Sequence, residues 1–153
     1  TQAISTATIQ ALGTAVASLT TSSLSTAQVA ALTTAQIESL TGPLSTAQTQ
    51  AISTANIQAL GTNVAALTAG MFSNTQVGAL TSVQVGSLTS NAVSPLSSTQ
   101  IGALSSAAVT GLPLSGLSTA QSQALTTKDI QALGTSVASL STAMLTTAQV
   151  AAM

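Results

Sequence analysis

An eight-residue unit recurs along the whole chain, and it constrains the fold more than any other feature. The unit begins with a large apolar residue and continues Ser/Thr-Thr-Ala-Gln-Val/Ile, as in 24–31 (LSTAQVAA) and 32–39 (LTTAQIES). Further copies begin at Leu44, Ile52, Phe72, Leu80, Leu96, Leu104, Leu117, Leu125 and Leu145. Repetition of this kind is typical of arrays in which each unit packs on its neighbours.

Each eight-residue unit, which we call an octad, carries the signals of a helix start. Ser25 is a preferred N-cap residue, and Gln28 completes a capping box three positions later. Leu24 and Val29 then stand at the two positions of a hydrophobic staple. The same register predicts structural N-caps at Ser25, Thr33, Ser45, Ser53, Ser73, Thr81, Ser97, Ser118 and Thr146. In two octads Asn56 and Asp129 replace the Gln.

A seven-residue variant of the unit carries Gly in its second position. Gly13, Gly61 and Gly134 each follow Gln-Ala-Leu. A Gly with a left-handed backbone is a common helix terminator, so we expect a helix to end at each of these positions.

The units group into larger blocks, two of which, 44–71 and 117–144, are copies of one unit of 28 residues. The array divides into 1–23, 24–43, 44–71, 72–95, 96–116, 117–144 and 145–153. The chain opens without an initiator Met and closes in mid-pattern. We therefore expect one continuous repeat array over 1–153, taken from a longer or processed protein.

Short capped helices indicate an all-α fold. A helix of one or two turns is marginal alone, so the octads must stack on one another, which predicts a repeat solenoid of short N-capped helices. The alternative is a β-solenoid with coils of 20–28 residues, because Thr and Val favour strands. Ala and Gln are poor strand residues, and the octad lacks strict alternation. Disorder is a third possibility, and the high aliphatic content argues against it.

The large apolar positions predict one continuous buried spine. Its members are Leu24, Leu32, Leu40, Leu44, Ile52, Leu60, Leu67, Phe72, Leu80, Leu88, Leu96, Leu104, Leu112, Leu117, Leu125, Leu133, Leu140 and Leu145. We expect a second set to pack beside it: Val29, Ile37, Ile57, Val77, Val85, Ile101 and Ile130.

Composition excludes most chemistry. Glu38, Lys128 and Asp129 are the only charged side chains among 153 residues, and the chain has no His, Cys or Arg. Acid–base catalysis, metal binding and nucleic-acid binding each need clusters of such groups. We therefore expect no enzyme activity, no catalytic residue, no cofactor, no metal site and no nucleic-acid partner. Ser, Thr or Gln interrupts the uncharged stretches too often for a membrane span of about 20 apolar residues.

Several residues allow a functional and a structural interpretation. Ser and Thr occupy 50 of the 153 positions, which suits an ice-binding face or glycan acceptors, but capping and solvation explain them better. The Gln positions suit ladders between stacked chains, although capping and surface solvation are favoured. Phe72 replaces the Leu of its octad, which indicates a core residue. Lys128 and Asp129 are interpreted as surface substitutions.

The octads L-S/T-T-A-Q-V/I-x-A-L are similar to the LTTAQVAAL-type repeats of very large secreted or surface proteins of Gram-negative bacteria, often described as adhesin-like. The resemblance covers essentially the whole chain. It implies an extracellular or cell-surface location and a structural role in adhesion, a sheath, a filament or a biofilm matrix. It carries no catalytic or binding residues.

The expected function is therefore structural. Net charge is −1 and mean hydropathy is +0.56, so little keeps copies of the chain apart. We expect self-assembly of identical chains into an extracellular filament, sheath or matrix fibre. The alternative is a monomeric stalk or binding module of a large bacterial adhesin.

Overall fold

The computed structural model describes residues 4–153; the first three residues of block 1–23 lie outside the described part. Within residues 4–153 the chain forms short α-helices and 3-10 helices and no strand. The predicted all-α helical repeat is confirmed, and the β-solenoid alternative is wrong. Many of the Thr residues that suggested strands stand instead at an N-cap or in a first helical turn, as Thr33 and Thr34 do.

The elements are short and evenly distributed. The α-helices are α1 (Thr6–Ala11), α2 (Thr26–Ala30), α3 (Thr34–Ser39), α4 (Thr46–Ala51), α5 (Thr54–Ala59), α6 (Asn74–Gly78), α7 (Ser82–Ser87), α8 (Ser90–Val93), α9 (Ser98–Ala103), α10 (Ser106–Val109), α11 (Thr119–Gln123), α12 (Thr127–Leu133) and α13 (Thr147–Ala151). The 3-10 helices are η1 (Gly13–Ser18), η2 (Thr21–Ser23), η3 (Gly61–Ala66), η4 (Ala69–Met71), η5 (Leu114–Gly116), η6 (Gly134–Ser139) and η7 (Thr142–Met144).

A Ser or Thr hydroxyl stands at the start of every α-helix among residues 4–153. The side chains of Ser25, Thr33, Ser45, Ser53, Ser73, Thr81, Ser97, Ser118 and Thr146 each accept a backbone N–H at N3. The sequence pattern did not single out Ser5, Thr89, Ser105 and Thr126, which cap helices in the same way. The Asp129 side chain forms a full capping box, whereas the Asn56 side chain, which has the same length, instead donates to the Leu32 carbonyl of the preceding block.

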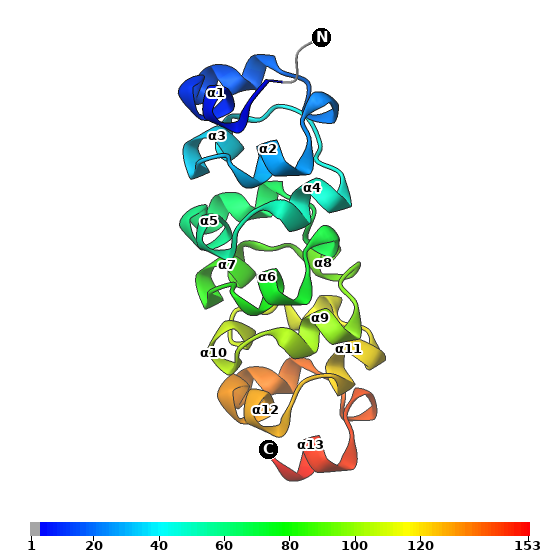
Figure 1. Cartoon of the computed structure of the whole chain (residues 1–153). Helices are drawn as coiled ribbons and strands as arrows, with labels where there is room; N and C mark the ends of the chain where they lie inside the picture. Colours follow the sequence, from blue (N-terminus) through cyan, green and yellow to red (C-terminus); the bar gives the residue numbers. More distant parts are fainter. Residues whose placement is uncertain (1–3) are drawn as a thin grey trace.

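Successive blocks stack on one another to form an elongated molecule (Figure 1). A complete block, which we call a coil, contains a first helix, a second helix and a return segment. First helices (α2, α4, α6, α9, α11, α13) follow one another along one side of the stack, and second helices (α1, α3, α5, α7, α10, α12) along the other (Figure 1). Helix α2 packs on α4, α6 on α9, and α10 lies between α7 and α12.

Coils differ mainly in the return segment. Coil 44–71 returns through η3 and η4, coil 72–95 through α8, and coil 96–116 through η5 alone. Coil 24–43 has no return helix, so residues 40–43 lead directly from α3 to the next coil. Coils of different length therefore differ in the return segment, and each keeps its first and second helix.

The three Gly residues after Gln-Ala-Leu all have φ of +52°. The preceding α-helix ends there, as the sequence indicated, and a 3-10 helix begins directly at the Gly. At Gly134 the ψ angle is −129°, which differs from the left-handed helical region proposed from the sequence.

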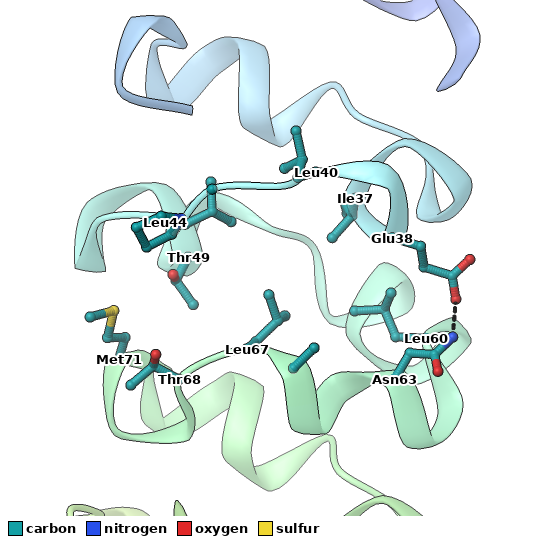
Figure 2. Close-up of a pocket in the computed structure, with 13 residues that line it drawn as sticks. Ile37, Glu38, Leu40, Leu44, Thr49, Leu60, Asn63, Leu67, Thr68 and Met71 are labelled. Carbon is teal, nitrogen blue, oxygen red and sulfur yellow. Dashed lines mark hydrogen bonds between the residues drawn. The ribbon is translucent and has the colours of Figure 1, made fainter. Parts of the chain in front are cut away.

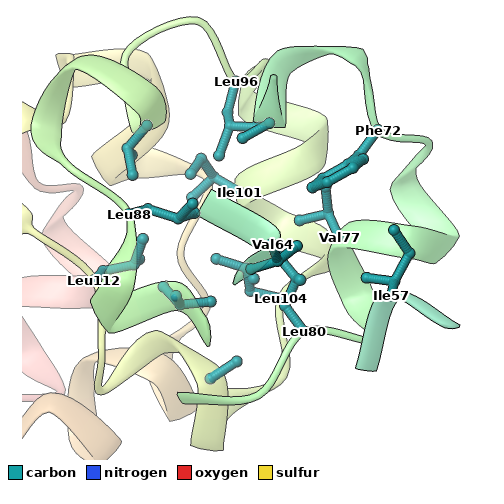
Figure 3. Close-up of a cluster of buried hydrophobic side chains, with 14 of the residues drawn as sticks. Ile57, Val64, Phe72, Val77, Leu80, Leu88, Leu96, Ile101, Leu104 and Leu112 are labelled. Carbon is teal, nitrogen blue, oxygen red and sulfur yellow. The ribbon is translucent and has the colours of Figure 1, made fainter. Parts of the chain in front are cut away.

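The buried side chains form one continuous hydrophobic cluster along the stack, part of which is drawn in Figure 3. It contains all members of the predicted spine except Leu40 and Leu67, and all members of the set predicted to pack beside it. Phe72 is in this core and 2 % exposed. The prediction for Leu40 and Leu67 is corrected: both are only partly buried, because they line a cavity between their two coils.

Candidate functional site

The charged residues are not gathered into one site. Glu38 on α3 and Lys128 on α12 are exposed. The Asn63 side chain on η3 donates a hydrogen bond of 2.6 Å to the Glu38 carboxylate (Figure 2). Residues 4–153 contain no group of three or more His, Cys, Asp or Glu side chains arranged to hold a metal ion.

Asp129 is buried, and its interpretation as a surface substitution is wrong. It is 2 % exposed and accepts hydrogen bonds from the Thr126 backbone N–H at 2.7 Å and the Thr126 hydroxyl at 2.8 Å. The Ser106 hydroxyl of the preceding coil donates a third, at 2.6 Å. The carboxylate therefore caps its own helix and also ties α12 to α10.

The capping glutamines bind two coils together. In Gln76, Oε1 accepts the Ser73 backbone N–H at 2.9 Å, while Nε2 donates to the carbonyls of Thr49 and Ile52 in the preceding coil at 2.8 and 2.7 Å. The Gln84 Nε2 donates in the same way to Ile57, at 2.6 Å. Every buried capping Gln makes such bonds to carbonyls 23–28 residues earlier in the chain.

These contacts correct the prediction that the Gln side chains are solvated. The buried members are Gln36, Gln48, Gln76, Gln84, Gln100, Gln121 and Gln149. The sequence did contain a signal of this burial. Gln recurs at one octad position, whereas a solvent-exposed position would accept any polar residue. A side chain that must accept locally and donate to a neighbouring coil requires an amide of this length.

Two hydroxyl side chains occupy core positions that the sequence analysis did not single out. Thr49 and Ser122 stand where other first helices carry Val29, Val77 or Ile101. Ser122 is fully buried, and its hydroxyl has no hydrogen-bond partner among the described residues. Thr49 is 2 % exposed and lines the cavity described next.

A cavity of about 420 Å³ lies between coils 24–43 and 44–71 (Figure 2). Ile37, Leu40, Leu44, Leu60 and Leu67 supply much of its apolar lining. The Thr49 and Thr68 hydroxyls and the Glu38–Asn63 pair are its polar elements. Figure 2 draws one hydrogen bond among the lining residues, from Asn63 to Glu38, and none to the Thr49 hydroxyl.

The cavity follows from the short return of coil 24–43. Coil 96–116 precedes the other copy of the 28-residue block and is one residue longer, returning through Pro113-Leu114-Ser115-Gly116 instead of Thr41-Gly42-Pro43. There η5 packs on η6, and Leu114 is buried. Leu140, the counterpart of Leu67 in that block, is buried as well. Coil 24–43 has no counterpart of η5 at its interface with the following coil.

Comparison with known proteins identified no relative. Neither the scan against protein-family models nor the searches of curated proteins and of solved structures found a match. None of the helices in the described part is both long and apolar enough to cross a membrane.

Proposed function

We propose that this chain is a structural repeat protein whose identical copies associate, coil on coil, into an extracellular filament, sheath or matrix fibre. The observation that carries the proposal is the repeated coil interface. It is built from buried aliphatic side chains and from Gln Nε2 donors that meet backbone carbonyls, with almost no charge. Each coil offers donors on one face and carbonyls on the other, so a coil of a second chain is a suitable partner.

Such an interface joins unlike faces, head to tail. Head-to-tail contacts that do not close into a ring generate open fibres. In the 153-residue chain the exposed large apolar residues lie mainly at the two ends of the stack: Ile4 and Leu12 in the first coil, Val150 and Met153 in the last. A coil from another copy at either end would remove these side chains from water, which is favourable.

The flanks of the stack favour association along its axis over lateral clumping. Val83 is the one large hydrophobic side chain on the flanks of residues 4–153 that is strongly exposed, at 66 %. The remaining flank surface is dominated by Ser, Thr, Ala and Gln. A net charge of −1 adds little repulsion between copies. The extracellular location rests on the resemblance of the octads to adhesin-like surface repeats.

The test is sedimentation and negative-stain electron microscopy of the 153-residue chain. We expect filaments that sediment unchanged in about 1 M NaCl and in EDTA, since there are few ion pairs to screen. Guanidinium, which solvates apolar and peptide groups, should release monomer. A dilute, freely soluble monomer before treatment would overturn the proposal and favour the adhesin-stalk alternative. Release by salt or EDTA alone would also overturn it.

A matched pair of variants tests the geometry of assembly. Val150→Lys places a charge at the end of the stack, and Val83→Lys places the same charge on its flank; both side chains are exposed, so both variants keep the fold. We expect Val150→Lys to abolish sedimentation and Val83→Lys to preserve it. The reverse result would show that copies associate through their flanks.

A further inference from the structure

We propose that the cavity between coils 24–43 and 44–71 is a binding site for a small, uncharged molecule that has an apolar body and a hydrogen-bonding oxygen. Binding there would not depend on the assembly proposed above, because the cavity lies between two coils of one chain and is lined entirely by that chain. Three features of the cavity support the proposal: its size, its lining and the buried Thr49 hydroxyl.

The size of the cavity matches that of a ligand site, and its surface divides almost equally between apolar and polar atoms. Pockets that hold small molecules are about 300–1,000 Å³ in volume and mainly apolar, with a few placed polar groups. The cavity here is about 420 Å³, and well over twice the ~150 Å³ of an engineered apolar cavity that binds benzene. The cavity separates two coils that are otherwise in contact, and it reaches the surface beside the exposed residues Pro43 and Asn63, where a molecule could enter.

Thr49 supplies the polar contact. Its side chain is almost completely buried and lines the cavity, and no hydrogen bond joins its hydroxyl to the other lining residues drawn in Figure 2. A hydroxyl at a buried position is costly unless it is hydrogen-bonded, whereas Val at this octad position, as in Val29 and Val77, would avoid the cost. An oxygen of a bound molecule would form a hydrogen bond with this hydroxyl.

The charged groups around the cavity determine which chemical class of ligand it can bind. No cationic side chain lines the cavity, and the nearest charge is the Glu38 carboxylate at its edge, already bound to Asn63. A carboxylate or phosphate inside would therefore be repelled and left without a counter-ion. Neutral alcohols, ketones and esters with an aliphatic or aryl body fit the site, and their anionic analogues do not.

The probe for this site is prodan, a neutral naphthyl ketone whose fluorescence reports transfer from water to an apolar site. We expect saturable binding at one site per chain. The neutral competitor 1-decanol should displace prodan at a concentration at least about tenfold lower than decanoate does at neutral pH. The absence of saturable binding, or equal displacement by the two competitors, would overturn the proposal.

Two leucines in equivalent positions provide the control. Leu67→Phe extends a half-buried side chain into the cavity, and Leu140→Phe makes the same change in the filled interface of block 117–144. We expect Leu67→Phe to weaken prodan binding at least tenfold and Leu140→Phe to leave it unchanged while lowering the melting temperature. Equal affinity in wild type and Leu67→Phe would place the probe elsewhere and overturn the assignment.

Thr49→Val keeps the test decisive if the larger side chain impairs folding. Val occupies this position in other octads, so the variant is expected to fold. Loss of the hydroxyl should weaken prodan binding about tenfold without altering sedimentation. Unchanged binding by this folded variant would refute the role of Thr49.

Discussion

The Nε2 atom of Gln76 lies 2.7 Å from the carbonyl oxygen of Ile52, which precedes it by 24 residues. The Oε1 atom of the same amide accepts the Ser73 backbone N–H, which starts helix α6. One side chain therefore begins its own helix and fastens it to the coil before it. Helix formation and coil stacking are coupled through this amide.

Replacing a buried capping Gln by Glu should separate these two roles. In Gln84→Glu the carboxylate still accepts the Thr81 N–H, but its second oxygen faces the Ile57 carbonyl. We expect the free energy of unfolding at pH 7 to fall by about 3 kcal/mol. Guanidinium unfolding followed by circular dichroism measures the loss. The control is Gln58→Glu, whose exposed amide donates to Ala79 and whose change should cost less than about 1 kcal/mol.

The same variant has a defined pH dependence. Burial beside carbonyls raises the pKa of the introduced carboxyl in the folded state. Its stability is then greatest below the unfolded Glu pKa of about 4.3, where the protonated group donates to Ile57, and declines as pH rises through the raised folded pKa. The deficit relative to wild type should therefore shrink between pH 7 and pH 4. A deficit that is constant over this range would contradict the proposed geometry.

Removing the unpartnered Ser122 hydroxyl should stabilise the chain. Ser122 is fully buried, and its hydroxyl has no partner among the described residues. Ser122→Ala eliminates the desolvation cost and should raise the free energy of unfolding by about 1 kcal/mol. Ser115→Ala on the exposed part of η5 is the control and should change it by less than about 0.5 kcal/mol. Destabilisation by Ser122→Ala would mean that the hydroxyl has a structural partner.

Asp129 and Ser106 should show coupled energetics. Ser106→Ala removes one of three hydrogen bonds to the carboxylate and should cost about 1 kcal/mol, whereas Asp129→Ala should cost about 3 kcal/mol. The double variant should cost less than the sum, by at least about 0.5 kcal/mol, because the two residues share one bond. Additive losses would exclude a direct interaction, and Lys128→Ala serves as the neighbouring exposed control.

Two glycines should respond oppositely to the same substitution. Gly134 has φ of +52° and ψ of −129°, a conformation that L-residues rarely adopt, so Gly134→Ala should cost about 1–3 kcal/mol. Gly86 lies within α7, and an added Cβ would meet nothing nearer than 3.6 Å, so Gly86→Ala should stabilise by about 0.5–1 kcal/mol. Thermal unfolding compares the pair, and a gain in stability at Gly134 would refute the strained turn.

Local signals in the sequence were sufficient to predict where the octad helices begin. Ser25 and Gln28 lie three residues apart, and the bonds between them form in any chain that turns into a helix there. Val29 also faces the core, as the octad register predicted. Period and capping residues therefore predict where helices begin and which face of each is buried, because both depend on contacts within one octad.

The candidate site could not be predicted in this way. The cavity accompanies the absence of a return helix from coil 24–43, whereas coil 96–116 has η5 with the buried Leu114. Within its own block, each of these segments has the sequence of an ordinary loop between two helices. Their effect appears only when the next coil is placed against them.

The sequence by itself thus determined an all-α array of capped octads with a continuous apolar spine, because its caps and periodicity act over three to eight residues. Only the tertiary structure decided that the glutamines and Asp129 are buried, that the Ser122 hydroxyl lacks a partner among the described residues, and where the coils fail to fill space. The physical reason is that stacking pairs groups some 23–28 residues apart while the coils vary between 20 and 28 residues in length. Which donor meets which carbonyl is therefore set by coil packing rather than by spacing along the chain.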